Sequence, residues 1–182
     1  MQSGKNLEGE VMKIKGEKVI IKQTDRGDLN DIQQLWNNGE VMGAVGYPDG
    51  IGQTFAQMGI WFKSIQESEE INHFVVLSKA DNFCGELFYR KNPGDKRAGL
   101  DIKFLPESRG RGLAAEAFQL FIDYIFEAEA EIEAVWTEPA AENRAARKLY
   151  TRIGFKEKER PADLESERPY WELSREDWQK RN

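Results

Sequence analysis

Residues 105–114 read LPESRGRGLA and mark the point where a strand stops and a long helix begins. The segment 98–105 alternates apolar and charged residues, which predicts a strand, and Pro106 ends it. Apolar residues recur at helical spacing over 112–128. The two glycines of the turn let a ligand approach the backbone closely. A turn of this kind directs several N–H groups and the positive end of a helix dipole at one place, which is typical of a phosphate site.

The same ten residues allow other interpretations. One is a basic surface turn before a helix, with no ligand. Another is a dinucleotide fingerprint, because Gly110, Gly112 and Ala115 match the G-x-G-x-x-G/A pattern. That fingerprint belongs to a doubly wound parallel sheet, and too little chain remains after the next predicted strand, 132–137, to build one.

A second motif lies downstream, where residues 142–155 read ENRAARKLYTRIGF. Together with Arg109-x-x-Gly112-x-Ala114 it resembles the two acetyl-CoA segments of the GNAT acetyltransferases, Q/R-x-x-G-x-G/A and N-x-x-A-x-x-L-Y-x-x-x-G-F. The spacing across one helix and one strand is also similar to that family. The opening of the chain, 12–46, resembles the RimJ/RimL-like branch, which acetylates the N-termini of ribosomal proteins.

Antiparallel strands precede a β-α-β-α unit, which predicts a mixed α/β sheet with helices on both faces. The resemblance implies the GNAT fold, with a mostly antiparallel sheet of six to seven strands that is splayed at the cofactor site. The length predicts a single domain, 1–182. Outside the two motifs, the patterns predict a hairpin or an arm and strand at 11–23, helices after Asp25 or Asp28 and at 55–65, strands at 71–79, 83–90 and 169–173, and a helix capped by Ser174.

The resemblance also implies how acetyl-CoA, the co-substrate, is held. The pantetheine arm lies along the strand that ends at Phe104 and Leu105. Asn143 contacts this arm, caps its own helix, or does both. The pyrophosphate rests on main-chain amides of Arg109, Gly110, Arg111, Gly112, Leu113 and Ala114.

Tyr150 matches the family's general acid. A phenol can protonate the thiolate that leaves when an amine attacks the thioester. The alternative is a core tyrosine, because Tyr150 shares one helical stripe with Ala146 and Ile153. The candidate general bases are Asp101, on the strand that leads to the cofactor, and Glu138, at the end of the next strand, and water could serve in their place.

The expected reaction is direct acetyl transfer to a primary amine in a ternary complex. The acceptor is either a protein N-terminus or a small molecule. The alternatives are a non-catalytic acetyl-CoA-binding module and, more remotely, a dinucleotide-binding enzyme. Residues 39–53 contain five glycines and are expected to be a long loop, serving as a lid or as a flexible connector.

Composition excludes several other classes. The net charge of −6 gives no basic footprint for nucleic acid. One cysteine, Cys84, and one histidine, His73, are too few for a typical zinc site, so no metal is expected. His73 is expected to be a strand residue. The chain lacks a signal-peptide pattern and a run long enough to span a bilayer, so a cytoplasmic protein without membrane contact is expected.

Overall fold

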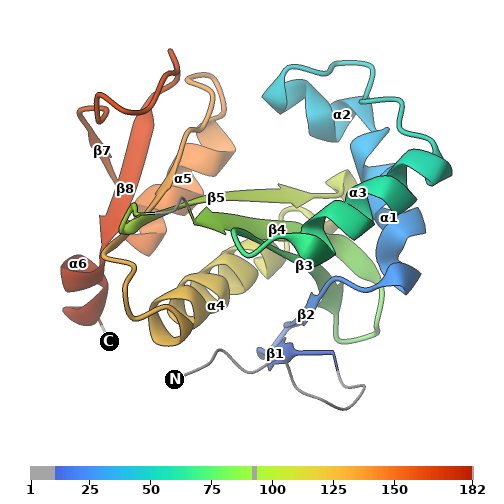
Figure 1. Ribbon diagram of the computed structural model, residues 1–182, viewed down its shortest axis with the longest axis horizontal. Helices are drawn as coiled ribbons and strands as arrows, with labels where there is room; N and C mark the ends of the chain where they lie inside the picture. Colours follow the sequence, from blue (N-terminus) through green and yellow to red (C-terminus); the bar gives the residue numbers. More distant parts are fainter. Residues whose placement is uncertain (1–10, 92–93, 182) are drawn as a thin grey trace.

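A computed structural model describes residues 11–91 and 94–181, and within them eight strands form one sheet. Its order is β1-β2-β3-β4-β5-β6-β8-β7 (Figure 1). Neighbouring strands are antiparallel except β5 and β6, which are parallel. The strands are β1 (Lys13–Lys15), β2 (Val19–Gln23), β3 (Ile71–Ser78), β4 (Phe83–Lys91), β5 (Arg97–Phe104), β6 (Ala134–Thr137), β7 (Lys156–Lys158) and β8 (Tyr170–Ser174).

The first hairpin gives the sheet one strand more than the six to seven predicted. β1 and β2 pair with Lys13 opposite Lys22. The amide of Gly16 donates to the carbonyl of Val19 at 2.9 Å and closes the turn. Of the two interpretations of 11–23, the hairpin is therefore correct.

Helices cover both faces of the sheet, as predicted. Side chains alternate along β3: Phe74 and Val76 join the core beneath α4, whereas Val75 packs with α1 and α3 on the opposite face. The helices are α1 (Leu29–Trp36), α2 (Gly39–Met42), α3 (Phe55–Glu67), α4 (Leu113–Ala128), α5 (Arg144–Ile153) and α6 (Arg175–Gln179), with 3₁₀ turns η1 (Arg26–Asp28), η2 (Gly43–Val45) and η3 (Pro106–Ser108).

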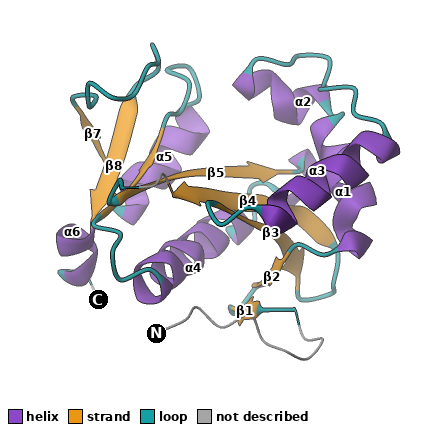
Figure 2. Ribbon diagram, viewed as in Figure 1, coloured by secondary structure: helices purple, strands orange, loops and turns teal. Residues whose placement is uncertain are grey.

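The sheet opens between its two parallel strands. β5 pairs with β6 only from Arg97 to Gly99, while the rest of β5, Leu100 to Phe104, continues without a partner on that side. In Figure 2, β7 and β8 stand steeply against β4 and β5, so the two halves of the sheet diverge. This opening is the predicted splay. It also excludes the doubly wound parallel sheet that a dinucleotide fold requires, because β5 and β6 are the sole parallel pair in the described part of the chain.

The expectation that residues 39–53 form one long loop is wrong. Asn38 caps α2, its side chain accepting a hydrogen bond from the amide of Glu40 at 2.9 Å. Val41 and Met42 are buried against Leu35. The glycines of this segment indicated flexibility, but Gly39 is a point of close approach: a Cβ there would lie 2.0 Å from the carbonyl oxygen of Pro48.

Candidate active site

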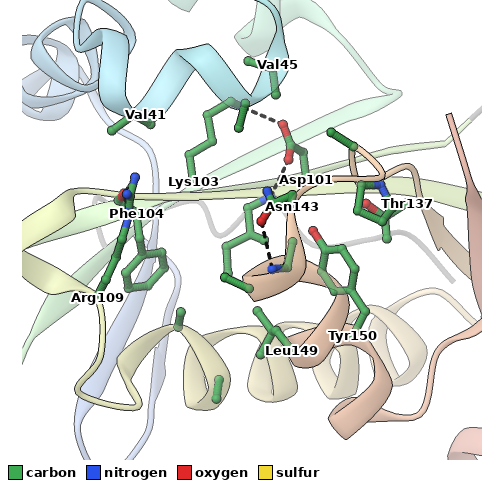
Figure 3. Close-up of a pocket in the computed structure, with 18 of the residues that line it drawn as sticks. Val41, Val45, Asp101, Lys103, Phe104, Arg109, Thr137, Asn143, Leu149 and Tyr150 are labelled. Atoms are coloured by element: carbon green, nitrogen blue, oxygen red, sulfur yellow. Dashed lines mark hydrogen bonds and ion pairs between the residues drawn. The ribbon is translucent and has the colours of Figure 1, made fainter.

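A cavity of about 530 Å³ lies at the opening between β5 and β6. The segment α2–η2 covers one side, while α5 and the start of α4 form the other (Figure 3). Both predicted motifs reach it. The lining residues are Glu40, Val41, Ala44, Val45, Asp101, Ile102, Lys103, Phe104, Ser108, Arg109, Gly110, Gly112, Ala114, Ala115, Thr137, Glu138, Pro139, Ala140, Glu142, Asn143, Ala145, Ala146, Leu149, Tyr150 and Arg168.

The turn between β5 and α4 exposes backbone to this cavity. Gly110 and Gly112 adopt left-handed conformations, with φ of 74° and 78°, which residues with a Cβ rarely adopt. Gly112 is the N-cap of α4 and provides no side-chain cap. The first amides of this 16-residue helix are therefore available to an anion.

The predicted cofactor residues divide into two groups. Six of them, Phe104, Arg109, Gly110, Gly112, Ala114 and Asn143, line the cavity. Leu113 is buried in the core, Leu105 packs against the cluster of Leu35, and Arg111 is exposed to solvent. The contacts predicted for these last three therefore depend on their main-chain groups.

The Arg109 side chain holds the turn in place. Its guanidinium donates to the carbonyl oxygen of Phe104 at 3.0 and 3.2 Å and to Glu40 of α2 at 3.1 Å. Asn143 caps α5 by accepting from the amide of Ala146 at 3.1 Å. The capping interpretation of Asn143 is thus correct, and its position on the cavity wall leaves the cofactor contact as a prediction.

Tyr150 lies deep in the cavity wall. Its side chain is 3% exposed, and its ring packs against Phe118 and Phe155 at centroid distances of 5.3 and 5.7 Å. Figure 3 shows the hydroxyl directed toward Asp101. Burial raises the pKa of Tyr150 and the Asp101 carboxylate adds to the increase, although Thr137 and Lys103 oppose it. The phenol therefore keeps its proton at neutral and mildly alkaline pH.

Asp101 belongs to a line of charges that leads into the protein. It accepts a hydrogen bond from Lys103 at 2.6 Å, and Lys103 lies 3.2 Å from Glu86, which is 1% exposed. Burial alone would raise the pKa of Glu86, but Lys103, His73 and Trp36 lower it to about 2. Burial likewise works against the raised pKa of Lys103, and the two carboxylates outweigh it. This arrangement keeps Asp101 beside a permanent cation.

The remaining predicted residues have structural partners. Glu138 forms an ion pair with Arg160 and lines the cavity near Thr137. His73 is a β3 residue, as predicted; its Nε2 lies 3.2 Å from Glu86, and its Nδ1 lies 2.7 Å from the Thr24 hydroxyl. It does not line the cavity.

A second cavity of about 400 Å³ adjoins the first. Sequence patterns did not indicate it, because its walls come from segments far apart in the chain. Val45 lies in the segment predicted to be a loop, and Arg168 carries no motif. The lining residues are Val45, Phe88, Arg90, Gly99, Leu100, Asp101, Trp136, Thr137, Glu138, Leu164 and Arg168.

Two features are absent from the described residues. No three His, Cys, Asp or Glu side chains gather into a possible metal site in residues 11–91 and 94–181. Across the same residues, no helix combines the length and apolar character needed to cross a membrane.

The chain belongs to the acetyltransferase (GNAT) domain family, whose profile matches residues 18–156, and it is therefore an acyltransferase. Members of this family use acetyl-CoA as the acetyl donor. No curated protein matches the chain by sequence.

Solved structures share the fold at low sequence identity. A spermidine N-acetyltransferase from Vibrio cholerae, in complex with CoA and spermine, has a TM-score of 0.77 and 22% identity over 90% of this chain and 99% of its own. A dodecameric structure of the V. cholerae enzyme has a TM-score of 0.74 and 21% identity over 92% of this chain and 99% of its own. A GNAT-family acetyltransferase from Bacillus anthracis has a TM-score of 0.73 and 19% identity over 91% of this chain and 99% of its own.

Proposed function

We propose that the chain transfers the acetyl group of acetyl-CoA to a primary amine by direct attack in a ternary complex. One observation carries the proposal: a single cavity joins an uncapped helix start at one end to a buried, protonated tyrosine at the other. The unpaired edge of β5 connects the two ends.

The residues fit an extended thioester ligand. Gly110 has open space around it, and the nearest atom to a Cβ at Gly112 would be Nζ of Lys18 at 3.4 Å, so a pyrophosphate can approach the amides of α4 here. The edge of β5 from Leu100 to Phe104 has no partner strand and can pair with the amides of a pantetheine arm, as an added strand would. Two groups along it already have side-chain partners: the Phe104 carbonyl accepts from Arg109, and the Ile102 amide donates to Asp101. Small side chains of α4 and α5, including Ala114 and Ala146, leave room for that arm.

Tyr150 supplies the proton that the reaction needs. The amine nitrogen forms a bond to the carbonyl carbon, the carbon–sulfur bond breaks, and the sulfur receives a hydrogen bond or proton from the phenol. The amine must lose a proton, and Asp101 or Glu138 is placed to accept it through water or directly. An α-amino group, with a pKa of about 7.7–8.0, requires less help than a lysine side chain at about 10.4.

The acceptor is a protein N-terminus or a small-molecule amine. The first choice accords with the resemblance of the opening segment to the RimJ/RimL-like branch. The second accords with the fold shared with spermidine N-acetyltransferases. With either acceptor, the reacting amine would lie where the two cavities meet, beside Asp101, Thr137 and Glu138.

A thiol-release assay tests the proposal. Purified protein with acetyl-CoA is given peptides with free N-termini, polyamines and amino sugars, and product formation is checked by mass spectrometry. We expect release that depends on the acceptor and a melting temperature raised by acetyl-CoA but not by NAD(P). Acetyl-CoA binding without turnover on any amine would identify a binding module instead.

A further inference from the structure

The second cavity begins where the acetyl group would be transferred. Five residues line both cavities: Val45, Asp101, Thr137, Glu138 and Arg168. An amine at this shared wall leaves the rest of its molecule in the second cavity. The chemistry of that cavity therefore describes the acceptor.

The two acidic residues that line the second cavity are each already paired with a basic side chain. Asp101 is bound by Lys103 at 2.6 Å, and Glu138 is paired with Arg160. Neither Lys103 nor Arg160 lines the second cavity, so both cations approach from behind its wall. The acids thus contribute little free negative charge for a polycationic acceptor.

The two arginines that line the same cavity, in contrast, have no partner for their guanidinium groups among the described residues. The guanidinium groups of Arg90, on β4, and Arg168, before β8, form no hydrogen bond or ion pair with any residue in 11–91 or 94–181. Arg90 is exposed and Arg168 is half-buried. A guanidinium presents a planar set of donors that matches carboxylate and phosphate oxygens, and such charge-assisted bonds are among the stronger ones in proteins.

Apolar side chains line the second cavity together with these arginines. Phe88, Trp136 and Leu164 line the cavity. The Trp136 ring lies directly over Gly99, where a Cβ would come within 2.8 Å of the indole. A ligand in the second cavity therefore meets apolar side chains as well as the two arginines.

We infer that the acceptor is an amine whose own molecule also carries an anionic group, a carboxylate or a phosphate, held by Arg90 and Arg168. This inference depends on the proposed acetyl transfer. It disfavours polyamines, which offer no anion to the two arginines and bring further positive charge beside them.

Matched acceptor pairs test the inference. The dipeptide Ala-Phe is compared with its C-terminal amide, and phosphoethanolamine with ethanolamine, with spermidine as the polycation. We expect the anionic member of at least one pair to exceed its neutral partner, and spermidine, by at least about tenfold in kcat/KM. Whichever pair shows the effect identifies carboxylate or phosphate as the preferred group.

Variants assign the preference to the two arginines. Arg168→Gln and Arg90→Gln should each reduce the ratio within the preferred pair, and the double variant should bring it close to one. The affinity of Arg90→Gln for acetyl-CoA should stay unchanged, because Arg90 lines the second cavity and not the first. Arg26→Gln, at an exposed position in η1 outside both cavities, is the matched control and should keep the full ratio.

Several results would overturn the inference while leaving acetyl transfer intact: equal rates within both pairs, a preference for spermidine, or an undiminished ratio in the double variant. A loss of acetyl-CoA affinity in Arg168→Gln would place that residue in the donor site and count against it as well. If no probe is acetylated, calorimetry of the same pairs on CoA-saturated protein decides. Equal or absent binding overturns the inference, whereas thiol release with any other amine tests the proposed function separately.

Discussion

The two adjoining cavities are lined by different types of residue. The first combines the glycine turn and the alanines of α4 and α5 with larger side chains, whereas the second is lined mainly by large side chains that include two aromatic rings and two arginines. A site made from main chain tolerates changes of side-chain chemistry but excludes bulk. A site made from side chains changes with every substitution. In the proposed function, binding of the donor therefore depends mainly on the shape of the glycine turn, and binding of the acceptor on side-chain chemistry.

The largest effect is expected at Tyr150, close to where the cavities meet. Tyr150→Phe keeps the ring and its packing on Phe118 and removes the proton donor. The value of kcat should fall by roughly 10²–10⁴ while acetyl-CoA affinity changes little, because the lost interaction forms in the transition state. Steady-state kinetics and calorimetry measure the two quantities. A folded variant with near-normal kcat would make Tyr150 a packing residue only.

The charges behind the shared wall should matter for stability. Glu86→Gln removes a buried carboxylate from Lys103 and should reduce the free energy of unfolding at pH 7 by about 3 kcal/mol. The pKa of Glu86 is lowered from 4.5 to about 2, so its contribution is present above pH 4.5 and is lost as the pH falls toward 2.

Urea unfolding of wild type and variant from pH 7 down to pH 2.5 checks this window, where the difference should shrink. Glu159→Gln, at an exposed position, is the control for a lost negative charge. A difference that stays constant with pH would show that packing, and not charge, explains the loss.

On the donor side, added bulk and charge should weaken binding. Gly112→Glu places a carboxylate at the start of α4, and acetyl-CoA affinity should fall at least tenfold, or about 1.4 kcal/mol. Gly94→Glu is a matched control, because Gly94 has φ of 76° against 78° and lies outside both cavities. Equal affinity in the two variants would remove the phosphate site from this turn.

The smallest effect is expected on the acceptor side. Gly99→Ala pushes a methyl group against the Trp136 ring, at 2.8 Å before relaxation, and displaces this wall of the second cavity. The acceptor KM should rise about fivefold with acetyl-CoA affinity unchanged, consistent with the modest cost of overpacking. Gly59→Ala in α3, where a Cβ has open space, serves as the control. A change in acetyl-CoA affinity would show that the cavities are not separable.

The same contrast explains what the sequence could predict. The donor side consists of two contiguous segments, 105–114 and 142–155, whose spacing is local and therefore visible in the sequence. The sheet opening followed from the resemblance that these segments carry. The strands and the helices on both faces followed from hydrophobic periodicity, which is also a local property.

The acceptor side could not be predicted because its residues meet only in the folded chain. Val45, Phe88, Trp136 and the pair Leu164 and Arg168 come from four separate segments. The alternation in β5 likewise placed Lys103 among polar residues, yet its side chain is 10% exposed, because Glu86 on the neighbouring strand makes a buried charge acceptable. The glycines at 39–53 suggested a loop, whereas Gly39, in α2, is needed because the backbone of Pro48 packs closely against it.

The opening between β5 and β6 gives the sheet an additional edge in its interior. Exposed strand edges are templates for pairing with other chains and are a common origin of aggregation. Here the free edge from Leu100 to Phe104 lies in a cavity flanked by α2, α4 and α5. A second polypeptide would have to displace these helices to add a strand, whereas a slender, unbranched arm can enter. The helices that line the first cavity thereby also restrict the pairing of another chain with this edge.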